Sequence, residues 1–201
     1  MTVGSETATP ACTAWDNGEC EGTPHCPPRC PRFRDADGDA FIARCYRSSD
    51  RESLLTMYEE IDDYNRTMGL PPKGRSRLET WVDRLTTNGW NLVVVADDRI
   101  VGHTAVVPAD SDSPEFIIFV HQDFQNSGIG SELIKQLIAY AKDKNHQALT
   151  LEVAKGNKQA ISVYQNIGFE VTNRKLSELA MALELQLPIA DQVQRPPAKR
   201  E

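Results

Sequence analysis

The chain has 201 residues, which is the length of one ordinary domain with short extensions. Hydrophobic residues make up 40% of it and charged residues 25%, which excludes collagen-like and wholly disordered chains. The formal net charge of −7 argues against sequence-independent binding to nucleic acid or anionic lipid, because both need clustered positive charge.

Apolar runs in the sequence are far shorter than the roughly 20 residues that a membrane-spanning helix needs, so no membrane partner is expected. The first residues lack the basic start and apolar stretch of a secretory signal, so we expect a cytoplasmic location. In a reducing compartment the five cysteines are expected to be thiols or metal ligands rather than disulfides.

Composition divides the chain into three regions. Residues 1–40 are rich in proline and cysteine and have almost no apolar periodicity, which predicts an irregular arm. Residues 41–187 alternate between strand-like and helix-like patterns, which predicts a folded domain. Residues 188–201 end in a proline-rich, charged stretch, which predicts a flexible, solvated tail.

Within residues 41–187, strands are predicted from alternating or continuous apolar residues, and helices from apolar residues at helical spacing. In chain order the expected elements are a strand at 41–46, a helix from about 50 to 61, a helix at 76–86, strands at 91–96, 100–107 and 115–120, a helix from 129 to about 144, a strand at 148–154, a helix at 158–167 and strands at 169–171 and 178–187. Asn157 is expected to cap the last helix and Gly168 to end it. The pattern predicts a mixed α/β domain whose strands are first antiparallel and later joined by crossover helices.

The most informative segment is the glycine-rich stretch before the third predicted helix. Gly128 and Gly130 flank one apolar residue at a strand-to-helix junction. Glycine lets the backbone approach a ligand, and a helix N-terminus offers unpaired N–H groups, so the segment suits a pyrophosphate. For an isolated pair of glycines, a tightly packed helix entry is the alternative. The segment lacks the Gly-Lys-Ser/Thr ending of a P-loop and the third glycine of a dinucleotide-binding turn.

Two motifs in order resemble those of the GCN5-related N-acetyltransferase (GNAT) superfamily. The motif Q/R-x-x-G-x-G/A stands here at residues 125–130. The later motif N-x-x-A-x-x-x-Y-x-x-x-G-F stands at residues 157–169. The resemblance covers residues 41–187 and is strongest over 115–171.

This resemblance implies a twisted, mostly antiparallel sheet of six to seven strands flanked by four helices and splayed between the fourth and fifth strands. Acetyl-CoA would lie in the splay, with its pyrophosphate on the backbone N–H groups of residues 126–130 and its pantetheine arm along the preceding strand. The residues implied to contact it are Phe119, Val120, Gln125, Asn126, Ser127, Gly128, Ile129, Gly130, Ser131, Asn157 and Tyr164.

The resemblance also implies catalytic roles. Tyr164 matches the family's frequent general acid, because a phenol can protonate the departing thiolate. Glu115 matches the position of the general-base glutamate of histone-type members, and an apolar strand would raise the pKa of its carboxyl group. Glu152 is the rival base, and a chain of water molecules is a third alternative. For each side chain a purely structural role is the competing interpretation.

Four cysteines lie within 19 residues of the arm: Cys12, Cys20, Cys26 and Cys30. Four soft ligands this close could surround one structural zinc ion and give the arm a reason to fold. None of their spacings is the C-x₂-C pattern, so a flexible arm with unpaired thiols is the alternative.

The leading functional hypothesis is an N-acetyltransferase that moves an acetyl group from acetyl-CoA to a primary amine of a small molecule or protein. The first two helices and their neighbouring loops are expected to form the acceptor region, around Tyr58, Tyr64, Met68 and Trp81. The alternative is a zinc-stabilised module that binds acyl-CoA without turnover. No nucleic-acid partner is expected, and formation of a homodimer is left open.

Overall fold

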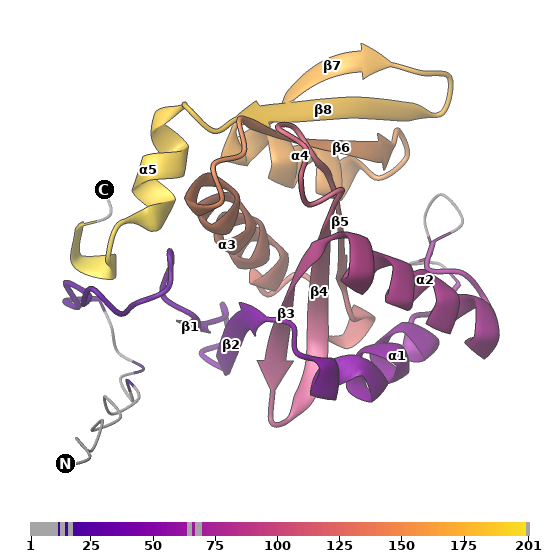
Figure 1. Cartoon of the computed structure of the whole chain (residues 1–201), viewed down its shortest axis with the longest axis horizontal. Coiled ribbons are helices and arrows are strands. Elements are labelled where there is room, and N and C mark those ends of the chain that lie inside the picture. Colours follow the sequence, from indigo (N-terminus) through magenta and orange to yellow (C-terminus); the bar gives the residue numbers. More distant parts are fainter. Residues whose placement is uncertain (1–11, 13–14, 16–17, 64–65, 67–69, 200–201) are drawn as a thin grey trace, which may run out of the picture.

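The computed structural model describes residues 12, 15, 18–63, 66 and 70–199 (Figure 1). These residues form one eight-stranded sheet with the strand order β1-β2-β3-β4-β5-β6-β8-β7. The strands are β1 (Arg32–Arg34), β2 (Ala40–Cys45), β3 (Trp90–Ala96), β4 (Arg99–Val107), β5 (Glu115–Val120), β6 (Ala148–Ala154), β7 (Glu170–Arg174) and β8 (Glu178–Glu184). The α-helices are α1 (Arg51–Glu60), α2 (Arg75–Asn88), α3 (Ile129–Asp143), α4 (Lys158–Ile167) and α5 (Pro188–Gln194).

This architecture confirms the predicted fold class, a mixed and mostly antiparallel sheet. The described part of the chain has eight strands and five α-helices, slightly more than the six to seven strands and four helices expected. The additional strand, β1, lies in the arm, and the additional helix, α5, lies in the C-terminal segment. Both lie outside the part of the sequence where apolar periodicity is clear.

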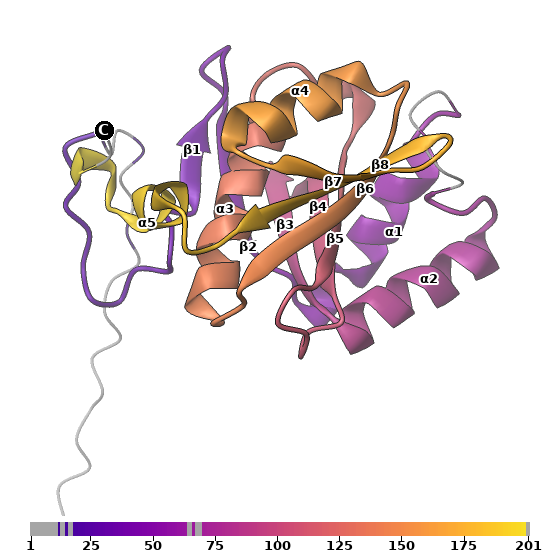
Figure 2. The same cartoon turned by 90° about the horizontal axis from the view of Figure 1, so that it is seen from above.

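The two faces of the sheet pack against different helices through their apolar side chains. Val93 packs with α1 and α2, whereas its neighbours Leu92 and Val94 pack with α3 on the opposite face. Successive side chains of a strand point to opposite faces, so the continuous apolar run of β3 is buried on both faces of the sheet. Figure 2 shows α3 on one side of strands β2 to β5 and α1 with α2 on the other.

The sheet splits between β5 and β6. These two strands are parallel, and their register is given by Glu115 opposite Thr150. From that point they diverge, as Figure 1 shows, because β6 turns to pair along its whole length with β8 while β5 stays paired with β4. The part of β5 beyond Glu115 therefore has one edge free of the ladder, which fits the predicted splay between the fourth and fifth strands of the domain.

The C-terminal segment corrects the prediction of a flexible tail for residues 188–201. Pro188 occupies the first turn of α5, where its fixed φ is compatible with a helix. Ala190 and Val193 are buried against the core that α3 also joins. Residues 188–199 are thus part of the folded domain, and residues 200–201 lie outside the described chain.

The arm is also more ordered than an irregular extension. Arg32–Arg34 pair antiparallel with β2 and extend the sheet by one strand. The backbone N–H of Ala198 donates to the carbonyl oxygen of Cys20 at 3.2 Å, so the arm and the C-terminal segment contact each other. Among the helices of the described residues, none combines the length and apolarity needed to cross a bilayer.

Candidate functional site

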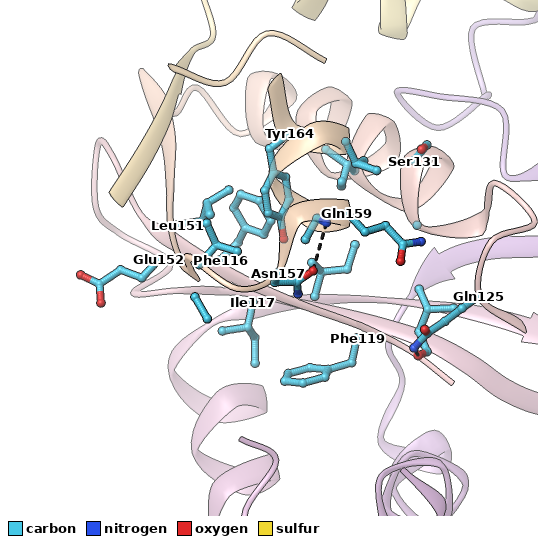
Figure 3. Close-up of a pocket in the computed structure, with 18 of the residues that line it drawn as sticks. Phe116, Ile117, Phe119, Gln125, Ser131, Leu151, Glu152, Asn157, Gln159 and Tyr164 are labelled. Carbon is cyan, nitrogen blue, oxygen red and sulfur yellow. Dashed lines mark hydrogen bonds between the residues drawn. The ribbon is translucent and has the colours of Figure 1, made fainter. Parts of the chain in front are cut away.

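A cleft of about 940 Å³ occupies the space where β5 and β6 diverge (Figure 3). β5 forms one wall, the end of β6 and the start of α4 form the other, and the glycine-rich turn before α3 closes one end. Ile61 and Leu70, which belong to the connection between α1 and α2, also line the cleft. The cleft therefore runs from the N-terminus of α3 to the first two helices.

The backbone of the glycine-rich turn explains its residue types. Gly128 stands at the N-cap of α3 with φ 98°, and Asn126 has φ 66°, which asparagine tolerates better than most residues. A Cβ atom added at Gly128 would meet no atom within 4 Å, so the requirement for glycine comes from the backbone conformation. The first N–H groups of α3 have no partner within the helix, and this end of α3 opens onto the cleft.

Most residues expected to contact acetyl-CoA line this cleft. They are Phe119, Val120, Gln125, Asn126, Gly128, Gly130, Ser131, Asn157 and Tyr164. Two others, Ile129 and Ser127, do not line it, and their expected contact through backbone N–H groups stays a prediction. Ile129 is fully buried in the core between α3 and the sheet, and Ser127 lies on the far side of the turn.

Helix α4 is positioned by the caps that its sequence predicts. The Asn157 side chain accepts a hydrogen bond from the backbone N–H of Ala160 at 3.1 Å, and Gly168 ends the helix with φ 116°. The Gln159 side-chain amide donates to the side-chain oxygen of Asn126. This bond joins the start of α4 to the glycine-rich turn across the cleft, so two walls of the site are tied together.

Tyr164 lies on the buried face of α4. Its ring is 7% exposed and packs against Phe116 and Phe169, with ring centroids 6.0 and 5.7 Å apart. Figure 3 shows its hydroxyl group directed into the cleft. A phenol is protonated at neutral pH, and burial raises the pKa of Tyr164 above its ordinary value, which favours this neutral form and makes the group a weaker acid. The group is therefore available as a proton donor.

Glu115 lines the cleft at the start of β5. Desolvation raises the pKa of its carboxyl group, and the negative charge of Glu152 raises it further, while Lys175 acts in the opposite direction. A carboxylate with a raised pKa holds a proton more strongly and is a better base toward an ammonium group. Glu115 thus lies in the cleft, but its side chain is exposed at the start of β5, and its role as the base remains a prediction.

Glu152 is placed differently. Its carboxylate pairs with the ammonium group of Lys175, which lies on the connection between β7 and β8. Figure 3 shows this carboxylate directed away from Tyr164 and Phe116. Glu152 borders the cleft through its place on β6 but holds its charge at the outer edge, which disfavours it as the rival base.

The structure does not support the prediction that the four arm cysteines hold a zinc ion. All four candidate ligands belong to the described residues, and among the described residues no three or more His, Cys, Asp or Glu side chains gather as a metal site. Cys20 and Cys26 accept hydrogen bonds from the backbone N–H groups of Gly22 and Thr23. The arm is instead ordered by contacts with α3 and the C-terminal segment, which a local cysteine pattern cannot reveal.

Of the four residues expected around the acceptor, two are described by the structure, and these two lie behind the cleft wall. Tyr58 is fully buried, and its ring packs edge-on against Trp81 and Phe119 at 5.0 and 5.5 Å. Tyr58 and Trp81 therefore support the cleft wall from behind through Phe119. Tyr64 and Met68 lie outside the described residues.

Several cleft residues were missed by sequence reasoning. They are Ile61, Leu70, Ile117, Ile118, Lys158, Gln159, Ala160 and Val163. Lys158 and Gln159 could have been predicted from the sequence. They follow the Asn157 cap, and the first turn of a helix whose N-terminus faces a ligand places its exposed side chains beside that ligand. Ile61 and Leu70 carried no signal, since their position depends on how the α1–α2 connection folds back.

Comparison with known proteins agrees with this geometry. The model of the acetyltransferase (GNAT) family matches residues 54–169. The [ribosomal protein bS18]-alanine N-acetyltransferase of Salmonella typhimurium is 35% identical over 86 residues, which are 42% of this chain and 58% of that protein. This chain therefore spans less than two thirds of the length of that relative.

Solved structures share the fold. The GNAT domain of S. lividans PAT superposes with a TM-score of 0.68 and 19% identity, over 76% of this chain and 95% of that one. The yncA protein of Salmonella typhimurium, solved with its cofactor acetyl-CoA, gives a TM-score of 0.59 and 18% identity, over 72% of this chain and 94% of that one. The family match spans more than half of the sequence and both motifs, and the chain belongs to the GNAT acetyltransferase family.

Proposed function

We propose that the protein transfers an acetyl group from acetyl-CoA to a primary amine of a small molecule or a protein. The observation that carries this proposal is a single cleft that joins the open N-terminus of α3 to Tyr164 and Glu115. Family membership and the relative named as an alanine N-acetyltransferase support the same reaction class.

The donor would lie along β5. Backbone N–H groups of residues 126–130 would hold the pyrophosphate, because the helix dipole and the unpaired donors both favour an anion. The free edge of β5 at Phe119 and Val120 would pair with the amide groups of the pantetheine arm. This path places the thioester beside Tyr164, with the first two helices beyond it.

The chemistry needs a neutral amine and a protonated leaving group. Glu115 would take the proton from the attacking ammonium, so that the nitrogen lone pair can bond to the thioester carbon. The carbon–sulfur bond then breaks as the amide forms. Tyr164 would give its proton to the departing thiolate, a role supported by the direction of its hydroxyl group into the cleft (Figure 3).

The test measures thiol release from acetyl-CoA with a panel of amines, together with calorimetry of CoA binding. Tyr164→Phe should lower kcat about a hundredfold, which is the usual scale of one general acid. Tyr46→Phe is the matched control, because Tyr46 lies outside the cleft, and it should keep full activity.

Two results would count against the proposal, and they separate its parts. Undiminished turnover by Tyr164→Phe would remove the general-acid role alone. If the wild-type protein bound no CoA and released no thiol with any amine of the panel, the whole proposed function would be wrong.

A further inference from the structure

The side chains of β5 alternate between the two faces of the sheet, and this alternation sorts the residues that line the cleft. Ile117 and Phe119 pack with α1 and α2, whereas Phe116 packs with Leu151 and Tyr164 on the other face. Figure 3 shows Ile117 and Phe119 on the side of β5 opposite to Phe116 and Tyr164. An acceptor that lies beside α1 and α2 therefore meets a different set of side chains from those around Tyr164.

Two carboxylates belong to the face that α1 and α2 share. Glu115 stands opposite Val107 in the antiparallel pair of β4 and β5, and Val107 packs with α1 and α2. Residues directly opposite in such a pair point to the same face, so Glu115 faces the same way as Ile117. Thr150 is the register partner of Glu115 on β6, and Glu152 shares its face because it lies two residues further along the strand. Glu115 and Glu152 thus lie on one face, close enough that the charge of Glu152 raises the pKa of Glu115.

The rest of this face is apolar. Its members are Ile61, Leu70, Ile117 and Phe119, which belong to one hydrophobic cluster and also line the cleft. Leu70, Ile117 and Phe119 are only half-buried, so they offer apolar surface to a molecule in the cleft. We call these four residues, together with Glu115 and Glu152, the acceptor face.

The cations around the cleft lie elsewhere or are already engaged. Among the described residues that line the cleft, Lys158 alone carries a positive charge, and it belongs to the first turn of α4, which is tied to the glycine-rich turn. Lys175 acts on the acceptor face but pairs with Glu152. Arg66, on the connection between α1 and α2, donates to the Pro71 carbonyl oxygen at 2.6 Å. Within the described chain, the acceptor face thus carries two carboxylates and no cation of its own that could pair with an anion.

We propose that the acceptor is a primary amine on an apolar body, aliphatic or aromatic, that carries no carboxylate beside the amine. The inference rests on the proposed function, because it assigns the acceptor of the same cleft. The two carboxylates attract the ammonium group of the acceptor, and the apolar side chains remove its body from water. A carboxylate beside the amine would meet these two carboxylates without a partner, and like charges in such a site repel. The acceptor face therefore selects against free amino acids.

The experiment measures thiol release from acetyl-CoA by the full chain with matched pairs of amines at one pH. Each pair has one member with a carboxylate and one without, namely phenylalanine with phenylalaninol and leucine with leucinol. Repulsion should make kcat/KM about tenfold higher for each amino alcohol than for its amino acid. Alaninol lacks the apolar body, and its kcat/KM should be about tenfold below that of phenylalaninol. A peptide that begins with phenylalanine also lacks a carboxylate beside its amine, and comparing it with phenylalaninol tells a protein acceptor from a small one.

Glu152→Gln tests the charge of the acceptor face, because Glu152 takes no part in the proposed proton transfers. The variant removes one carboxylate and releases Lys175, so the preference for phenylalaninol over phenylalanine should fall about threefold. A change in the pKa of Glu115 would alter both members of a pair alike and leave this ratio in place. Glu184→Gln is the matched control, because Glu184 is an exposed carboxylate at the end of β8, and it should keep the wild-type ratio.

Equal or higher kcat/KM for the amino acids would overturn the inference. The same conclusion would follow if Glu152→Gln kept the full preference, or if the wild type bound CoA but acetylated none of the amino alcohols and no peptide. Equal kcat/KM for alaninol and phenylalaninol would overturn the apolar part of the inference. A wild-type protein that binds no CoA and releases no thiol with any amine would instead overturn the proposed function.

Discussion

Two charged side chains near Glu115, those of Glu152 and Lys175, influence the proton affinity of the proposed base. Burial and the charge of Glu152 raise the pKa of Glu115, while Lys175 lowers it. Lys175 also pairs directly with Glu152, so it weakens the repulsion that Glu152 exerts. The pKa of the proposed base thus depends on a pair that the proposed mechanism does not use.

Removing the Glu115 carboxylate tests its role. Glu115→Gln should lower kcat/KM for the amine at neutral pH about a hundredfold and abolish the acid limb of its pH profile. Lys175→Gln should keep activity but move that limb to higher pH, because losing the cation raises the pKa of Glu115. Lys155→Gln is the control, because it removes a neighbouring charge that contacts the Leu176 carbonyl oxygen. The acid limb of its pH profile should stay at the wild-type pH. An unchanged limb in Glu115→Gln would assign the base to another group.

A buried histidine makes stability depend on pH. His103 is fully buried in β4, where its Nδ1 lies 2.5 Å from the Tyr58 hydroxyl and its Nε2 lies 3.0 Å from the Asn91 side-chain oxygen. The Asn91 oxygen can only accept, so Nε2 carries the proton and Nδ1 accepts from Tyr58. Desolvation lowers the pKa of His103 to about 3, so the folded protein keeps this ring neutral.

Acid should therefore destabilise the protein through His103. The unfolded ring gains a proton near pH 6.5 and the folded ring only near pH 3, so the stability it contributes is complete above pH 6.5 and is lost as the pH falls. Between pH 7 and pH 5 this loss amounts to about 2 kcal/mol. Urea unfolding of His103→Leu should show a correspondingly flatter pH dependence, whereas the exposed-site control His25→Leu should follow the wild type. Parallel curves for His103→Leu and the wild type would refute this.

At the scale of elements, the N-terminus of α4 is held by one side chain. The Asn157 oxygen satisfies the N–H group of Ala160, and the same end of the helix reaches the glycine-rich turn through Gln159 and Asn126. The helix has only ten residues, so its own hydrogen bonds give it little independent stability.

Loss of this cap should cost about 1 kcal/mol of unfolding free energy in Asn157→Ala. Asn157→Asp keeps an acceptor oxygen at the same place and should retain wild-type stability, which denaturant unfolding of the two variants will measure. Equal loss in both variants would show that Asn157 stabilises the protein through its amide nitrogen rather than through the cap.

Elements with a clear period could be predicted from the sequence, and those without one could not. The strand at 148–154 and the helix ending before Gly168 matched because each buries one face against its own neighbours. β1 was missed because its three residues are too few to show a period, and α5 was missed because its partners lie far away in the chain, such as Ala139, whose carbonyl oxygen accepts from the Gln194 side chain. Tyr58 was misplaced for a related reason, since an amphipathic pattern shows that a face is buried but not whether a cleft or the core lies behind it.

At the scale of the whole molecule, α3 joins the parts that the sequence presents as separate. One face of α3 packs on the sheet, its N-terminus borders the cleft, and its outer side holds the arm and α5. The arm and the C-terminal segment, at opposite ends of the sequence, meet on this helix, and Figure 2 shows them side by side. The contact between Arg29 and Glu132 is the most buried charged link in this assembly, with side chains 6% and 15% exposed.

Burial decides how much this ion pair matters. Arg29→Met leaves the Glu132 carboxylate buried with only Gln136 as a donor, so urea unfolding should show a loss of about 3 kcal/mol. Arg29→Met combined with Glu132→Met removes both charges and should recover most of that loss, because two apolar side chains can replace a buried pair. The control is the exposed pair of Arg51 and Asp83, which has the same two-bond geometry at 2.8 and 2.9 Å, and Arg51→Met should cost far less than Arg29→Met. If the double variant lost as much unfolding free energy as Arg29→Met and Glu132→Met together, the arm would be held by its backbone contacts and not by this ion pair. Equal losses of unfolding free energy in Arg29→Met and Arg51→Met would mean that burial of the pair has no effect.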